Sequence, residues 1–541
     1  MKTNLYNEIP YTKHVYQQTQ PNQLATLATL YGMQPPSVEK CRVLELGCAS
    51  GINTIAMAQA IPNGEFVGIE FSDQIKEGQN NVRQLGLSNI SLKKMDILEI
   101  EAELGLFDYV VAHGVYSWVS PAVRDKVLQI CSHHLQPNGI AYVSYNVYPG
   151  WHVDRMLREM MLYRTRKLTD PKEKLESAKK LLNFFMESIK HKFNSYSLSL
   201  KNELHHISQL NENYLAHEYL EEHNDPVLFH EFIEHANRHD LQYLADMRTP
   251  FVATDNFLSE TIDTLNFSVI EKEQYLDFLR NTAFRETLLC HQAISLNRDL
   301  VTDKISDLYI AAPLKLASKN ETPLSEPLEH DIIERFENLA GEAVLSVSSP
   351  LLKAVCLCLG EVWPQSLSFN HLIQQVTKLL TMVEKMGPKV EDRGKENTQT
   401  VLSPAEIDEV KIMLLEFYLK KIVELSVYPP QFTLTITERP IAGPIARLQS
   451  TQGKQVTNLR YEVFSLDLST RLVLSHLDGR YDRVALLGIL QKNIENGELI
   501  LYQDEQKKAL IDVDSETLHH HLSLKVETIL QSLAQKAYLV N

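Results

Sequence analysis

The chain has few cysteines, no long apolar run and less positive than negative charge, and each shortage narrows what it can be. Its six cysteines, at positions 41, 48, 131, 290, 356 and 358, are too scattered for a disulfide framework or a zinc pattern. No stretch of about 18 apolar residues occurs, and the first residues lack the apolar core of a signal peptide. We therefore expect a cytoplasmic protein without membrane insertion.

Charge and composition argue against a nucleic-acid-binding protein and favour an ordinary globular one. Lysine and arginine number 53 against 69 acidic residues, which gives a formal net charge of -16. Phosphate contacts need clustered Lys and Arg, so we expect no nucleic-acid partner. Hydrophobic residues at 44% and charged residues at 23% describe an ordinary globular protein. Its 541 residues are enough for three or four domains.

The stretch from residue 43 to residue 70 predicts a nucleotide-binding βαβ unit. Gly47 and Gly51 permit a sharp turn between a strand and a helix, and Glu70 ends the second strand, where it can accept both hydrogens of a ribose diol. A dinucleotide site has the spacing G-x-G-x-x-G, whereas these glycines are four apart and Glu45 precedes the first by two residues. This pattern is typical of class I methyltransferases, whose cofactor, S-adenosylmethionine, has a ribose but no phosphate.

Two aromatic turns follow the predicted strands 107–112 and 140–145. Ligands bind at the carboxyl ends of strands in open α/β sheets, so we expect both turns at the active site. The turns read His-Gly-Val-Tyr-Ser-Trp at 113–118 and Ser-Tyr-Asn-Val-Tyr-Pro-Gly-Trp at 144–151. With Tyr6-x-x-x-Pro-Tyr11 and Glu45-Leu-Gly-Cys-x-Ser-Gly51, they resemble bacterial class I methyltransferases that carry a methyltransferase regulatory domain. Within that group the chain most resembles rickettsial protein lysine methyltransferases, which modify an outer-membrane protein.

The resemblance implies a set of cofactor contacts. Asp96, at the end of the third strand, corresponds to the acid that meets the adenine amino group, although an acid in this place is about equally often a helix cap or a turn residue. Position 49 is Ala where the family pattern usually has Gly, and the turn is kept unless this position needs positive φ. The implied cofactor residues are Tyr11, Glu45, Gly47, Cys48, Ala49, Gly51, Glu70, Phe71, Ser72, Met95, Asp96, Ile97 and His113.

Chemistry suggests a second set of residues. Methyl transfer from a sulfonium is an in-line displacement, so the enzyme must align the acceptor and exclude water. A lysine acceptor must arrive neutral, and an apolar aromatic slot lowers its pKa. Asn146 can accept a hydrogen bond from the amine, and His113 is a candidate proton acceptor. The predicted catalytic residues are His113, Tyr116, Trp118, Asn146, Tyr148 and Trp151.

We expect an α/β fold with a seven-stranded, Rossmann-like class I methyltransferase sheet. Residues 241–245 and 284–290 resemble the sixth strand and the antiparallel seventh strand. The methyltransferase domain then comprises residues 1–151 and 223–295, with residues 152–222 as a helical insertion that serves as a substrate lid or as a buttress. A similar apolar pattern repeats after roughly 110 to 120 residues in the C-terminal half, which predicts two small domains. These are a helical or winged-helix-like middle domain, 296–432, and a winged-helix-like C-terminal domain, 433–541.

A metal site is not expected. His230, Glu231, Glu234 and His235 lie on one predicted helix, but the zincin spacing H-E-x-x-H places its histidines four apart, and here they are five apart.

Three functions remain open. The leading prediction is a methyltransferase acting on protein lysine, with a surface or outer-membrane protein as a possible substrate before its export. The others are a small-molecule N- or O-methyltransferase and a catalytically silent binding protein that uses the same fold. A homodimer is possible, because winged-helix modules in an acidic chain favour protein recognition or self-association.

Overall fold

The computed structural model describes residues 14–248, 266–317, 332–339, 341–386, 401–500 and 515–540. Tyr11 of the predicted cofactor set lies outside these ranges. The chain divides into two compact units, Met1–Val301 and Thr302–Asn541. No helix within the described ranges is long and apolar enough to cross a membrane.

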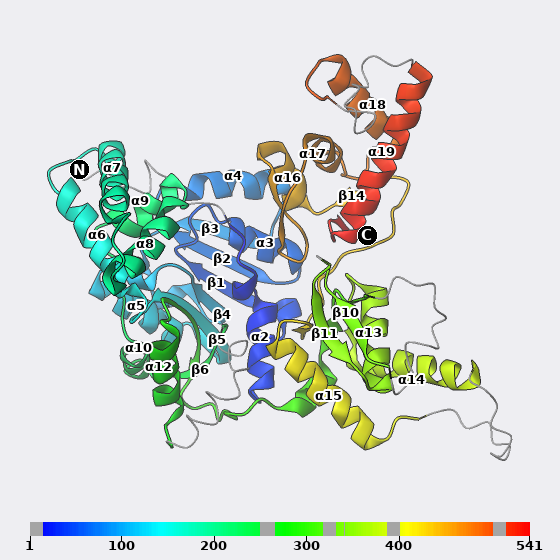
Figure 1. The fold of residues 1–541 in the computed structure, drawn as a ribbon, viewed down its shortest axis with the longest axis horizontal. Coiled ribbons are helices and arrows are strands. Elements are labelled where there is room, and N and C mark those ends of the chain that lie inside the picture. Colours follow the sequence, from blue (N-terminus) through cyan, green and yellow to red (C-terminus); the bar gives the residue numbers. More distant parts are fainter. Residues whose placement is uncertain are drawn as a thin grey trace. The chain divides into compact units, whose positions relative to one another are not determined.

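A seven-stranded sheet with the order β3-β2-β1-β4-β5-β7-β6 forms the centre of the first unit (Figure 1). The first five strands are parallel, whereas β7 runs antiparallel between β5 and β6. The predicted α/β class and the seven strands are therefore confirmed. The strands are β1 Arg42–Leu46, β2 Glu65–Glu70, β3 Ile90–Lys94, β4 Phe107–Ala112, β5 Leu135–Asn146, β6 Leu241–Asp246 and β7 Phe284–His291.

Helices cover both faces of this sheet, which is why its central strands read as continuous apolar runs. On one face, apolar side chains of α5 and α10 join Leu44, Val67 and Val110 of the sheet in one core. On the other face, α3 contacts Glu45 through the side chains of Asn53 and Thr54. The helices around the sheet are α2 Pro21–Leu30, α3 Ile52–Ala60, α4 Ile75–Leu85, α5 Pro121–His133, α10 Phe229–Asn237 and α12 Val269–Arg280.

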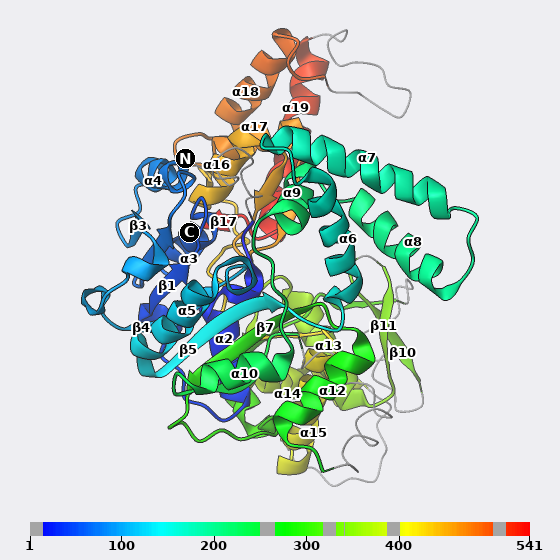
Figure 2. The ribbon, with the colours of Figure 1, turned by 90° about the vertical axis from the view of Figure 1, so that its left-hand side faces the viewer.

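Four helices connect β5 to α10 and have a hydrophobic core of their own. They are α6 Trp151–Thr165, α7 Pro171–Ile189, α8 Ser195–Ser208 and α9 Glu212–Leu220. Figure 2 shows α7 and α8 running antiparallel beside α6. Within this predicted helical insertion, Asn211 separates α8 from α9, because its side chain accepts a hydrogen bond from the backbone N–H of Tyr214 at 2.8 Å and starts α9.

The second unit contains two groups of helices, each ending in a helix that leads into a short strand. In the first group, α15 precedes β13 Glu424–Ser426, which pairs with β8 Tyr309–Ala311. In the second group, α19 precedes β17 Leu539–Val540, which pairs with β14 Ile441–Ala442. The helices are α13 Pro350–Val362, α14 Phe369–Met386, α15 Pro404–Leu419, α16 Pro444–Gln452, α17 Leu468–Ser475, α18 Arg483–Glu495 and α19 Ser515–Gln535.

Short strands complete this unit. They are β9 Lys315–Leu316, β10 Glu334–Glu337 and β11 Ala343–Val347 in one sheet, β12 Leu367–Ser368 beside β8, and the hairpin β15 Gln455–Thr457 with β16 Val463–Ser465.

Candidate active site

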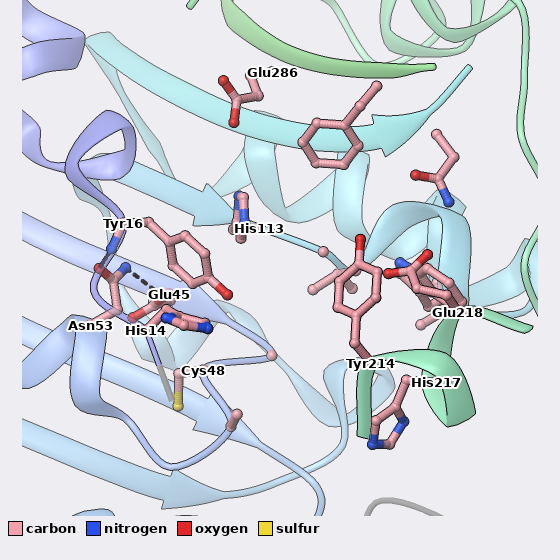
Figure 3. A pocket seen from close by; sticks show the side chains of 18 of the residues that line it. His14, Tyr16, Glu45, Cys48, Asn53, His113, Tyr214, His217, Glu218 and Glu286 are labelled. Carbon is pink, nitrogen blue, oxygen red and sulfur yellow. Dashed lines mark hydrogen bonds between the residues drawn. The ribbon is translucent and has the colours of Figure 1, made fainter. Parts of the chain in front are cut away.

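A cavity of about 660 Å³ opens at the carboxyl ends of β1, β2, β4 and β5, within the first unit. The glycine turn lies at one end, and side chains of α8 and α9 lie across from it (Figure 3). The predicted residues that line it are Glu45, Gly47, Cys48, Ala49, Glu70, Phe71, Ile97, His113, Trp118, Asn146 and Trp151. The remaining described ones, Gly51, Ser72, Met95, Asp96, Tyr116 and Tyr148, are not among the lining residues.

The turn between β1 and α3 needs backbone conformations that favour glycine. Gly47 has a φ of 66° and Gly51 a φ of 74°. A Cβ atom on Gly51 would lie 2.6 Å from Leu92, and one on Gly47 would lie 2.7 Å from Val115. Both glycines are therefore required by conformation and by space.

Ala49 occupies the same left-handed region, with a φ of 50°. The position therefore does need positive φ, the condition on which the expected effect of this alanine depended. An L-residue in this region costs roughly 1–2 kcal/mol. The turn is kept with some backbone strain.

Glu70 ties this turn to the end of β2. One carboxylate oxygen accepts the backbone N–H of Ala49 at 3.1 Å, and the other accepts the N–H of Ser72 at 2.8 Å. Each oxygen keeps a second lone pair, so the buried carboxylate can still accept hydrogen bonds from a ligand.

Glu45 anchors the N-terminal segment over the cavity. Its carboxylate accepts hydrogen bonds from Asn53 at 2.8 Å and from Thr54, and burial raises its pKa. The Asn53 amide oxygen in turn accepts the backbone N–H of Tyr16 at 2.9 Å. Tyr16, Asn53 and Thr54 are not among the predicted residues. Asn53 and Thr54 lie in the first turn of α3, where polar side chains commonly face solvent, and no motif marks Tyr16.

His113 lies at the end of β4 against the ring of Tyr16, with ring centroids 4.0 Å apart. Its Nδ1 lies 2.9 Å from the Tyr142 hydroxyl and 3.2 Å from the Ser144 hydroxyl. Burial, assisted by Arg248, lowers the pKa of His113 to about 3. The ring is therefore neutral near pH 7 and weakly basic.

Asp96 lies outside the cavity and caps a short helix. Its carboxylate accepts the backbone N–H of Leu98 at 2.9 Å, while Glu99 accepts the N–H of Asp96 at 3.3 Å. Ile97 and the half-exposed Phe71 are the residues of this edge that reach the cavity. They form an apolar rim beside Glu70.

The residues of the two aromatic turns lie in three places: at the cavity, in the core and on the surface. Trp118, Asn146 and Trp151 line the cavity. Tyr116 is buried against Phe232, with ring centroids 5.0 Å apart. The Tyr148 hydroxyl accepts a hydrogen bond from Arg155 at an exposed position.

Acidic and aromatic side chains form the end of the cavity across from the glycine turn. Glu218 of α9 is 8% exposed, and burial, with a smaller contribution from Asp154, raises its pKa to about 8. Tyr214 donates a hydrogen bond to Glu218, and Tyr219 donates one to Asp154 at 2.7 Å. Figure 3 shows Tyr214 and Glu218 facing the side of the cavity that carries Tyr16 and His113.

A third carboxyl supports this acidic end from α8. Burial, followed by repulsion from Asp154, raises the pKa of Glu203 to about 7. None of these acids is among the predicted residues, because a helical pattern does not indicate which cavity a helix will face.

Three family models match the chain. A methyltransferase domain matches residues 37–244, and a predicted methyltransferase regulatory domain matches residues 211–291. The PKMT C-terminal winged helix domain matches residues 438–538. The regulatory-domain match includes α9, β6 and β7, so it contributes both to the sheet and to the acidic end of the cavity.

Relatives and a solved structure cover nearly the whole chain. The uncharacterised protein RP789 of Rickettsia prowazekii is 35% identical over 518 residues, which cover 93% of this chain and 88% of the relative. A second uncharacterised protein of that organism, RP028, is 37% identical over 246 residues, 45% of this chain and 98% of its own. The structure of PKMT2 from Rickettsia typhi with AdoHcy has a TM-score of 0.82 and 28% identity, and the match covers 98% of this chain and 100% of that one.

These matches agree with the sheet order and with the cavity at its carboxyl edge. The chain belongs to the same family as RP789 and is an S-adenosylmethionine-dependent methyltransferase with a methyltransferase regulatory domain and a PKMT-type winged helix domain.

Proposed function

We propose that this enzyme methylates lysine side chains of a protein substrate. The observation that carries the proposal is the acidic, aromatic end of the cavity, where Glu218 and Asp154 lie among Trp151, Tyr214 and Tyr219. A cationic side chain is drawn to carboxylates and to aromatic faces alike. The family resemblance and the PKMT2 match support the same acceptor.

The glycine-turn end fits S-adenosylmethionine. Glu70 keeps free lone pairs for the ribose hydroxyls, and Phe71 and Ile97 offer apolar surface to the adenine. Asp96, at the neighbouring rim, would accept a hydrogen bond from the adenine amino group. When bound, the cofactor supplies a methyl group on a positively charged sulfur.

Glu218 would take the proton that the acceptor must lose. A free lysine has a pKa of about 10.4 and enters as an ammonium. Burial lowers the pKa of an amine and raises that of a carboxyl, so the two values converge in this pocket. In the empty pocket Glu218 is mostly protonated near pH 7, and the arriving ammonium favours release of that proton to solvent. Proton transfer from lysine Nζ to the resulting carboxylate then leaves a neutral amine beside a neutral acid.

The other cavity residues would orient the acceptor. With a pKa of about 3, the imidazole of His113 is too weak a base to take this proton, so we assign it the positioning of Tyr16 and Ser144. Asn146 lines the cavity and donates its side-chain N–H to Asn224 at 2.9 Å, and its amide oxygen would accept a hydrogen bond from the amine. Trp151 would pack along the lysine stem.

Labelled methyl transfer tests the proposal. Full-length enzyme is incubated with methyl-labelled S-adenosylmethionine and a bacterial extract separated by size, and the labelled protein is hydrolysed to amino acids. We expect methyllysine from the protein fraction, and much less of it with Glu70→Ala when the cofactor is not saturating. Label confined to small molecules would refute the lysine acceptor, while no label in any fraction would refute turnover itself.

We further propose that the substrate is a surface or outer-membrane protein methylated in the cytoplasm before its export, and that the enzyme acts as a homodimer. The resemblance to rickettsial enzymes supports both statements. Methyllysine mapping on outer-membrane proteins from cells with and without the enzyme tests the first, and light scattering of the purified chain tests the second.

A further inference from the structure

A cluster of two histidines and one aspartate lies on the sheet face that α5 and α10 cover. Asp125 belongs to α5, His235 to α10, and His239 follows the end of α10 by two residues. The two helices pack side by side (Figure 1). Among the described residues, this is the one group of three or more His, Cys, Asp or Glu side chains whose ligand atoms come together, within 4.8 Å of one another.

The three ligand atoms already converge. Nε2 of His235 lies 3.2 Å from the Asp125 carboxylate, and Nε2 of His239 lies 2.9 Å from the same oxygen. Tetrahedral zinc with bonds of about 2.0–2.1 Å holds its ligand atoms about 3.3 Å apart. The two histidines are four residues apart, which places them on one face of the helix and its terminal turn. The cluster therefore needs only small side-chain adjustments to surround an ion.

A second interaction orients His235. Its Nδ1 lies 2.8 Å from the hydroxyl of Tyr116. Histidines that bind metals through one ring nitrogen commonly donate the other N–H to a neighbouring oxygen, which sets the ring's tautomer and orientation. Tyr116 is buried against Phe232, so its hydroxyl is held in place.

Exposure leaves an entry route. The side chains of His235 and His239 are 14% and 16% exposed, whereas that of Asp125 is 62% exposed. An ion could arrive from solvent beside Asp125, meet the two partly buried imidazoles and keep water in its remaining position.

From this arrangement we infer that Asp125, His235 and His239 form a binding site for a divalent transition metal of the zinc type. Two imidazole nitrogens and one carboxylate oxygen are ligands that suit zinc. In the metal-free alternative, both histidines carry a proton on Nε2 and donate it in a hydrogen bond to Asp125. The two states differ in tautomer, because a bound metal requires the proton of each ring on Nδ1.

The site would act on the active site through Tyr116. This residue opens the turn Tyr116–Trp118, in which the Ser117 hydroxyl accepts the backbone N–H of Asn146 at 2.8 Å and Trp118 lines the cavity. A bound metal would fix the orientation of the His235 ring and, through its hydrogen bond with Tyr116, the position of this turn. The metal takes no part in the methyl transfer itself.

Zinc titration of the full chain tests this assignment. The histidines of the tract 519–521 on α19, of which His519 and His520 are exposed, could bind zinc weakly, so all proteins in this titration carry glutamine at the three positions. After removal of metals with a chelator, calorimetry should show one equivalent of zinc bound. Asp125→Asn and His239→Gln should each weaken binding more than tenfold, and Tyr116→Phe should weaken it about 10- to 100-fold.

His230→Gln is the matched control. His230 lies on the same helix but contacts Gln274, with its Nδ1 3.0 Å from the amide oxygen, so zinc affinity should not change. Asp125 is exposed, so Asp125→Asn should fold even if a histidine variant does not. Absence of stoichiometric binding, or binding that Asp125→Asn and His239→Gln leave unchanged, would overturn the assignment. So would NMR evidence that His235 keeps its proton on Nε2 with saturating zinc.

Discussion

The glycine turn and the α8–α9 end of the cavity each present a buried carboxyl group, but the surroundings of the two groups differ. At the turn, the Glu70 carboxylate accepts two backbone hydrogen bonds and is built into the loop. At the other end, Glu218 is buried with a pKa raised to about 8, and its main hydrogen-bond donor is the hydroxyl of Tyr214. The first carboxylate is held by two backbone N–H groups, whereas burial makes the second favour its protonated form. The difference suits one end to holding a ligand and the other to moving a proton.

Replacing Glu218 breaks this contrast with the largest expected effect. Glu218→Gln keeps the size of the side chain but cannot accept a proton, and removal of a general base typically costs about 10²- to 10⁴-fold. We expect kcat to fall about 10³-fold while calorimetric affinity for S-adenosylmethionine stays within about twofold. Glu212→Gln, at the exposed start of the same helix, is the control. Loss of cofactor binding in Glu218→Gln would show that the two ends are not separate.

The same group predicts a dependence of stability on pH. The folded pKa of Glu218, about 8, lies above its ordinary value of 4.5. Its contribution to stability is therefore complete below about pH 4.5 and is lost as the pH rises through about 8. Relative to Glu218→Gln, the melting temperature of the wild type should fall between pH 5 and pH 8, as calorimetry would measure. Parallel curves for the two proteins would contradict the raised pKa.

Replacing Glu70 tests the other end. Glu70→Ala leaves the N–H groups of Ala49 and Ser72 without their acceptor and removes the proposed ribose contact. Hydrogen bonds to charged groups contribute about 1.5–3 kcal/mol each. We expect cofactor affinity to fall about 100-fold, measured by calorimetry, whereas the exposed Glu39→Ala should bind as the wild type does. Unchanged affinity in Glu70→Ala would remove Glu70 from the cofactor site.

Restoring glycine at position 49 sharpens the comparison in the opposite direction. Ala49→Gly relieves the positive φ, and the gain of roughly 1–2 kcal/mol is partly offset by the roughly 0.5–1 kcal/mol of backbone entropy that glycine loses on folding. We expect stability to rise by about 0.5–1 kcal/mol in urea unfolding, with slightly tighter cofactor binding. Ala122→Gly, in the first turn of α5, should be destabilising instead.

Tyr148→Phe has the smallest expected effect. The hydroxyl accepts a hydrogen bond from Arg155 on the surface, away from the cavity. Loss of an exposed hydrogen bond should change stability by less than about 0.5 kcal/mol, and we expect kcat to change less than twofold in the labelled-transfer assay. By contrast, Trp151→Phe removes part of the cavity wall and should lower kcat clearly. Equal effects of the two changes would place Tyr148 in the active site.

Local patterns in the sequence were sufficient for the sheet and for the glycine turn. The apolar run before Gly47, the glycine spacing and Glu70 predicted β1, the turn and β2. These features lie within about 30 residues of one another, where chain geometry leaves few alternatives. The aromatic turns were also placed correctly along the chain, but side-chain direction separated Trp118 and Trp151 from Tyr116 and Tyr148.

What the sequence alone determined is the cofactor side of this protein, because a βαβ turn is a local structure whose glycines and acids have one geometric explanation. Only the tertiary structure decided the rest. Glu218 meets Asp154 from 64 residues earlier, and Asp125 meets His235 from 110 residues away, through helices whose apolar pattern shows which face is buried but not what it is buried against. Such long-range pairings depend on which helices pack against each other, and a single amino-acid sequence contains no local pattern that shows this.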